Sequence, residues 1–196
     1  MPIENTYHLG PSQRGRNRRR VGMRLSQFVE ENTPRSREDF LDHHPSAFLL
    51  VPDRSLQQLQ VGNSLYSTPP TGDLSAMTQV ETAAYDVTPL IKKARNSSGF
   101  MISVGRAGRC DIVIKDQRIS AYHAFFRWEP DSPQWTVIDA GSSHGLVIDG
   151  QKLSRSGMRN LQSGIEIDFA GALPCIFYTA SGLYDYLHLM GHLIGG

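Results

Sequence analysis

The chain gathers the residue types that bind a phosphate group between residues 105 and 150. Arg106 follows Gly105, and an arginine presents a planar fork of N–H donors that matches phosphate oxygens and stays charged at physiological pH. Ser120 adds a hydroxyl donor, while Gly105 and Gly145 allow the backbone to approach closely or to adopt left-handed geometry. A phosphate dianion carries about −1.5 to −2 charge at pH 7, so each of these bonds is charge-assisted. The pattern predicts a site that holds a phosphate.

The same residues lack the partners that catalysis needs. Ser120 and His123 are three positions apart, but no acid–histidine pair or nucleophile-elbow motif accompanies them. His188 and His192 are four apart without the glutamate of a metalloprotease motif, so packing is favoured over metal binding. We therefore expect a protein that is not an enzyme and that has no metal and no cofactor.

Short β-like runs must position these residues, because each conspicuous side chain falls at the end of a run or in a loop. The predicted strands are residues 100–104, 111–114, 122–128, 135–138, 146–148, 164–169 and 175–179. Turn residues separate them, and Asp149-Gly150 is the pair that a two-residue hairpin prefers. Many short strands with regular turns predict an all-β fold, a β-sandwich.

The two ends of the chain lack this pattern of short strands and turns. Residues 1–35 are predicted to be a disordered basic extension, although 25–31 have the pattern of two short helical turns. Ser36 has the features of a helix N-cap, and residues 47–51 form an apolar run typical of a strand. Residues 181–196 predict a helix whose apolar face, with Leu183, Leu187 and Leu189, packs on the sandwich; the alternative is dimerisation through this face. The expected domain is 36–180, and we expect a monomer.

Charge and composition exclude several classes of protein. Neither a signal core nor a bilayer-spanning run of about 20 apolar residues is present, so we expect no membrane contact. The two cysteines fit a reducing cytoplasm better than a disulfide-rich secreted module. Residues 1–24 hold six arginines against one glutamate, a solvated tail in the simplest interpretation. The alternatives are an anionic-surface binder and translation that starts at Met23; no nucleic acid partner is expected.

Three motifs occur in register: Gly105-Arg106, then Ser120-x-x-His123, then a segment from Asp139 to Gly150. This order resembles the forkhead-associated (FHA) domain family, in a bacterial single-domain arrangement with extensions at both ends. The family signature is Gly-Arg, Ser-x-x-His and Asp-x-x-Ser-x-Asn-Gly-Thr-x-x-Asn-Gly. The resemblance covers residues 83–179 and implies a sandwich of about eleven strands whose loops bind phosphothreonine peptides.

The resemblance also implies roles for single residues. Arg106 and Ser120 would contact the phosphate, Ala121 would offer its backbone N–H, and Ser143 and His144 would grip the peptide backbone. Arg118 would read an acidic residue three places beyond the phosphothreonine. The structural members of the motif would be Gly105, His123, Asp139, Gly145, Asp149 and Gly150, with the His123 ring holding neighbouring loops together.

The sequence departs from the family at four positions. His144 and Asp149 replace asparagines, Leu146 replaces a threonine, and Ala121 replaces a polar or basic residue. An imidazole can donate or accept at one nitrogen, so backbone recognition by His144 would change in geometry and acquire pH sensitivity.

The function that this resemblance implies is recognition of phosphothreonine-containing proteins in Ser/Thr kinase signalling. The alternative is a phosphate-independent scaffold that uses the sandwich face or the C-terminal helix. Ser67-Thr68-Pro69-Pro70 is interpreted as a turn, with a kinase site as the alternative.

Overall fold

The computed structural model describes residues 22–53, 84–94, 96 and 99–194, with the side chains of 191–194 left out. Two features of the sequence lie outside these residues. They are the arginine-rich run from Arg14 to Arg20 and the Ser67–Pro70 segment.

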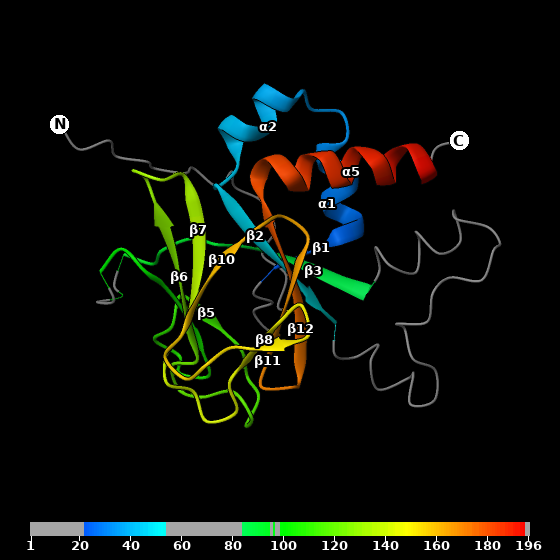
Figure 1. Ribbon diagram of the computed structural model, residues 1–196. Helices are drawn as coiled ribbons and strands as arrows, with labels where there is room; N and C mark the ends of the chain where they lie inside the picture. Colours follow the sequence, from blue (N-terminus) through cyan, green and yellow to red (C-terminus); the bar gives the residue numbers. More distant parts are fainter. Residues whose placement is uncertain (1–21, 54–83, 95, 97–98, 195–196) are drawn as a thin grey trace.

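Within the described residues, twelve strands form two sheets that pack face to face (Figure 1). The seven-stranded sheet has the order β1 (Met23–Arg24), β3 (Tyr85–Pro89), β2 (Ala47–Pro52), β12 (Leu173–Thr179), β11 (Ile165–Phe169), β8 (Leu146–Ile148) and β9 (Gln151–Lys152). The five-stranded sheet has the order β10 (Met158–Leu161), β7 (Gln134–Asp139), β6 (Ala124–Glu129), β4 (Ile102–Gly105) and β5 (Ile112–Val113). The predicted all-β sandwich is confirmed.

The main core lies between the sheets and is built by alternate residues of each strand. Phe126 of the five-stranded sheet stacks on Phe177 of the other at 6.3 Å between ring centroids, and both are fully buried. Trp135 and Val137 point into the same core, whereas Ile138, between the core-facing positions, is only half-buried. Inward-facing apolar side chains at every second position hold the two layers together.

Three helices cover the outer face of the seven-stranded sheet at one end of the sandwich (Figure 1). They are α1 (Leu25–Asn32), α2 (Arg37–His43) and α5 (Ala180–Ile194). Ser36 is the N-cap of α2, as predicted, and its hydroxyl accepts a hydrogen bond from the Asp39 N–H at 3.2 Å. These helices bury a second apolar cluster that includes Leu25, Phe48 and Leu183.

Two expectations for the chain ends need correction. The predicted disorder over 1–35 is wrong for residues 23–32, since α1 buries Leu25 and Phe28 against the sheet. The predicted apolar face of the C-terminal helix is too wide: Leu183 and Leu187 are buried, but Leu189 is 62% exposed. In the part of the chain that the structure describes, no helix is both long and apolar enough to cross a membrane.

The loops that carry the predicted site leave the sandwich at the end away from the helices (Figure 1). Trp128 and Trp135, near the β6–β7 hairpin, line a hollow together with Leu41 of α2 and Ser181 of α5. The other ends of these two strands, Ala124 and Asp139, join the loops 114–123 and 140–145. The helices therefore leave the site loops uncovered.

Candidate phosphate-binding loops

Gly105 brings the end of β4 against the loop that precedes β6. A Cβ built on Gly105 would lie 2.3 Å from the carbonyl oxygen of Ala121, so only glycine fits this close approach. The Arg106 N–H donates to the Ser120 carbonyl at 2.9 Å, and the Ala107 N–H donates to the Ala121 carbonyl at 3.0 Å. These bonds place Arg106 directly beside Ser120.

Arg106 is an exposed cation at this rim. Its Nε donates to the Ile119 carbonyl at 3.2 Å, which fixes the base of the guanidinium without neutralising it. Among the described residues, no carboxylate lies within ion-pair distance of Arg106. A charged fork held in place without a counter-ion is suited to an anion from outside the chain.

Ser120 joins the loop 114–123 to the loop 140–145. Its hydroxyl oxygen accepts the Ser143 N–H at 3.0 Å. The Ser120 hydroxyl lies 3.5 Å from Ser143 Oγ, at the outer limit of a hydrogen bond, so its proton can turn toward a ligand at little cost. The structure thus brings Arg106, Ser120 and Ser143 together.

His123 ties the same two loops from underneath. The ring is fully buried, its Nδ1 accepts the Ser120 N–H at 3.1 Å, and its Nε2 lies 3.0 Å from the Gly145 carbonyl, to which it donates. Burial lowers the pKa of His123 and outweighs the opposing effect of the Gly145 carbonyl. The ring is therefore neutral, with one nitrogen serving each loop.

Asp139 organises the loop 140–145 through its carboxylate, which is 2% exposed. Its Oδ1 accepts the N–H groups of Gly141 and Ser142 at 2.8 and 3.0 Å, and its Oδ2 accepts the Ser142 hydroxyl at 2.6 Å. Burial alone would raise the pKa of Asp139, but these bonds and one from Ser156 hold it below its usual value. Asp139 is therefore ionised at neutral pH and fixes the loop's shape.

Three residues with positive φ complete the loops. Gly145 has φ +81°, and its N–H donates to Ser142 Oγ at 3.0 Å. Asp149 and Gly150 have φ +46° and +72° and link β8 to β9, with Ile148 paired to Gln151. This is the two-residue hairpin that the sequence predicts.

The remaining predicted contacts lie at the surface with different surroundings. Ala121, Ser143 and His144 are exposed. Arg118 is exposed too, but its guanidinium binds Asp116 of the same loop, with Nη2 to Oδ2 at 2.9 Å and Nε to Oδ1 at 3.2 Å. This pairing raises the pKa of Arg118 and balances its charge locally.

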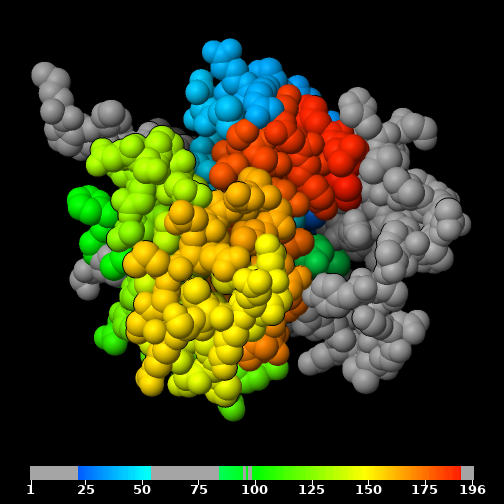
Figure 2. All heavy atoms as spheres, viewed as in Figure 1, coloured from blue at the N-terminus to red at the C-terminus, as the bar shows by residue number. Residues whose placement is uncertain are grey.

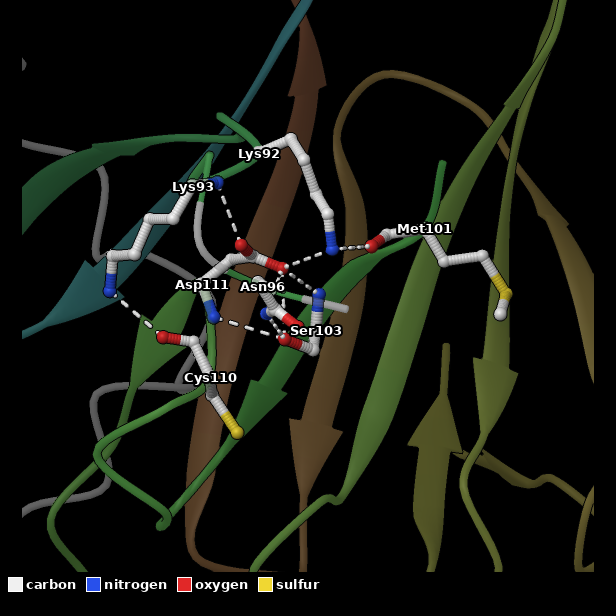
Figure 3. Close-up of polar contacts among 7 residues, drawn as sticks. All are labelled: Lys92, Lys93, Asn96, Met101, Ser103, Cys110 and Asp111. Atoms are coloured by element: carbon white, nitrogen blue, oxygen red, sulfur yellow. Dashed lines mark hydrogen bonds and ion pairs between the residues drawn. The ribbon is translucent and has the colours of Figure 1, made fainter. Parts of the chain in front are cut away.

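Asp111 is a buried carboxylate whose role the sequence did not indicate (Figure 3). Its oxygens accept the backbone N–H groups of Ser103 and Lys93, each at 2.7 Å, and the Ser103 hydroxyl at 2.8 Å. Further donors are Asn96 Nδ2 at 2.7 Å and Lys92 Nζ at 3.3 Å. Burial opposes ionisation, yet the bonds from Ser103, Lys93 and Asn96 lower the pKa of Asp111 overall. The carboxylate anchors the far end of the loop 106–111 that carries Arg106.

The described part of the chain holds no group of three or more His, Cys, Asp or Glu side chains arranged to bind a metal ion. The groups that the described loops offer to a ligand are the Arg106 guanidinium, the Ser120 hydroxyl and exposed backbone N–H groups.

Comparisons with known proteins found a curated relative and solved structures that are similar to parts of this chain. Protein phosphatase 2C 70 of Arabidopsis thaliana is 25% identical over 75 residues, which are 38% of this chain and 13% of the phosphatase. The FHA domain of the CT664 protein from Chlamydia trachomatis has a TM-score of 0.44 at 19% identity, covering 68% of this chain and 96% of that one. The MEK1 FHA domain in complex with a HOP1 phosphothreonine peptide has a TM-score of 0.39 at 24% identity, with 48% and 88% covered.

The family model that matches the sequence is the FHA domain, over residues 102–170. This range runs from β4 to the turn after β11 and contains Arg106, Ser120, His123 and the loop 140–145. Over residues 102–170, this chain therefore matches the FHA domain family.

Proposed function

We propose that this chain binds proteins that carry a phosphorylated threonine, the products of a Ser/Thr protein kinase. The observation that carries the proposal is Arg106: its backbone N–H binds the Ser120 carbonyl, its Nε binds the Ile119 carbonyl, and it has no carboxylate partner among the described residues. A phosphate placed there would satisfy the guanidinium, the hydroxyl and a loop N–H at once. The match to the FHA domain model supports the same function.

The proposed roles of the neighbouring residues follow from their positions. Ser143 and His144 lie exposed on the loop that Ser120 contacts, where they can bind the peptide backbone beside the phosphothreonine. The exposed Ala121 would contribute its N–H. Arg118 would reach an acidic residue of the peptide only by exchanging its bond to Asp116.

We infer that the chain acts as a non-catalytic recognition module. The loops would hold a phosphate without a group that activates water for its removal. The relative with phosphatase in its name matches over 13% of its own length, so the activity of that whole protein is not carried over. We further propose a monomer in the cytoplasm, where the buried thiols of Cys110 and Cys175 would stay reduced.

The test is capture by degenerate peptide libraries that contain phosphothreonine, phosphoserine or unmodified threonine at one fixed position. The wild-type chain should select phosphothreonine peptides. Arg106→Ala removes a charged hydrogen-bond donor worth about 1.5–3 kcal/mol, so affinity for an enriched peptide should fall about 10- to 150-fold.

The matched control is Arg127→Ala, which removes an arginine that lies within β6 and pairs with Glu129. It should bind phosphopeptides like the wild type, and both variants should unfold at the wild-type urea midpoint. Equal capture of all three libraries, or unfolding caused by Arg106→Ala, would refute the proposal. The phosphate-independent scaffold would then be favoured.

A further inference from the structure

Two cations, Lys152 and Arg155, lie against the glycines that frame the loop 140–145. A Cβ built on Gly145 would lie 3.4 Å from Lys152 Cε, and one built on Gly141 would lie 3.9 Å from Arg155 Nε. Arg155 Nη2 also donates to the Gly141 carbonyl at 3.4 Å. Both side chains are exposed, and the segment around them forms part of the open surface in Figure 2.

Asp139 holds the turn that carries Arg155 in a set position relative to this loop. The carboxylate accepts the Ser156 N–H at 3.3 Å, and the Asp139 N–H donates to the Gly157 carbonyl at 2.9 Å. Ser156 has φ +60°, an unusual conformation for a residue with a side chain. One buried carboxylate therefore positions both the loop 140–145 and Arg155.

These two cations differ from Arg118 in their charge balance. Within the described residues, neither Lys152 nor Arg155 has a carboxylate within ion-pair distance, whereas Arg118 binds Asp116 through two nitrogen atoms. An acidic group of a ligand gains attraction from an unpaired cation, but must compete with Asp116 for Arg118. Lys152 and Arg155 thus place unpaired positive charge beside the loop 140–145, in addition to the charge of Arg106.

We propose that Lys152 and Arg155 bind acidic side chains of the phosphopeptide and so set the sequence preference of the site. This inference rests on the proposed function. A peptide anchored at Arg106 and Ser120 that crosses the loop near Ser143 comes within reach of Gly141 and Gly145, where these cations lie. Acidic residues on that part of the peptide would be favoured over neutral ones.

The test uses a phosphothreonine peptide with alanine at every flanking position and a series in which one aspartate moves through those positions. Binding is measured by fluorescence anisotropy at low and high salt, each peptide also in its unphosphorylated form. For the wild type, aspartate at one or two positions should tighten binding about two- to fivefold, as expected for exposed ion pairs, and salt should remove this gain. In Arg155→Gln and Lys152→Gln the ratio of aspartate to alanine affinity should fall toward one. Arg127→Gln, with the same charge change elsewhere, should keep the ratio.

Three outcomes would overturn the inference. They are phosphate-dependent binding without any gain from aspartate, a gain that survives when Lys152→Gln and Arg155→Gln are combined, and a gain that only Arg118→Gln removes. If no peptide binds better than its unphosphorylated form, the proposed function itself fails, and this inference falls with it.

Discussion

Replacement of His123 by alanine tests whether this ring holds the two binding loops together. The change removes both bonds at once: the Ser120 N–H loses its acceptor, while the Gly145 carbonyl keeps only the Ala170 N–H at 3.1 Å. An unsatisfied buried N–H costs about 1–3 kcal/mol and the loss of one further hydrogen bond about 1 kcal/mol, so the expected loss in the free energy of unfolding is about 3 kcal/mol.

The assay is urea denaturation followed by tryptophan fluorescence, since Trp135 is buried in the core between the sheets. The matched control is His144→Ala, which removes the neighbouring exposed histidine and should change the free energy of unfolding by less than about 0.5 kcal/mol. Phosphopeptide affinity should also fall in His123→Ala, because the Ser120 backbone loses its anchor. A loss below about 1 kcal/mol, or equal losses in both variants, would refute the linking role of His123.

Two further predictions concern stability. Gly105→Ala places a methyl group 2.3 Å from the Ala121 carbonyl oxygen and should lower the free energy of unfolding in urea by about 1–3 kcal/mol. In the control Gly108→Ala the new methyl group meets nothing within 4 Å, so this change should be neutral or slightly stabilising. Equal effects of the two changes would contradict the close approach at Gly105. Burial lowers the pKa of His123 and of His44, so below about pH 6.5 the unfolded chain binds protons that the folded chain does not. The free energy of unfolding should therefore decrease as pH falls from 7 to 5.5, and a flat urea-midpoint profile over that range would contradict this.

The strands that could be predicted are those with a strong apolar pattern. The run at 135–138 became β7 and the run at 175–179 became β12, with boundaries shifted by one or two residues. Strands β9 and β10 were missed because their residues are mostly exposed and polar, without alternation. Such strands form because a paired neighbour supplies the hydrogen bonds, which the local sequence does not reveal.

Contacts in the site could be predicted from the sequence where a motif keeps the two partners close along the chain. Ser120 and His123 are three residues apart, and Asp139 and Ser142 likewise, so their contacts could be anticipated. The donors to Asp111 come from residues 92–103, and no local pattern shows that they meet. The pairing of Arg118 with Asp116 was also missed, because it depends on how the exposed loop turns.

The placement of β2 between two apolar clusters affects how its backbone amides exchange with solvent. Ala47 and Leu49 belong to the core between the sheets, while Phe48 and Leu50 belong to the cluster under the helices. β12 alternates likewise, with Cys175 and Phe177 on one face and Ile176 and Tyr178 on the other. Backbone amides in such doubly covered strands exchange with solvent only through global unfolding. The loops that bear Arg106 and Ser120 can therefore fluctuate on their own at one end, while β2 and β12 remain the slowest-exchanging unit of the domain.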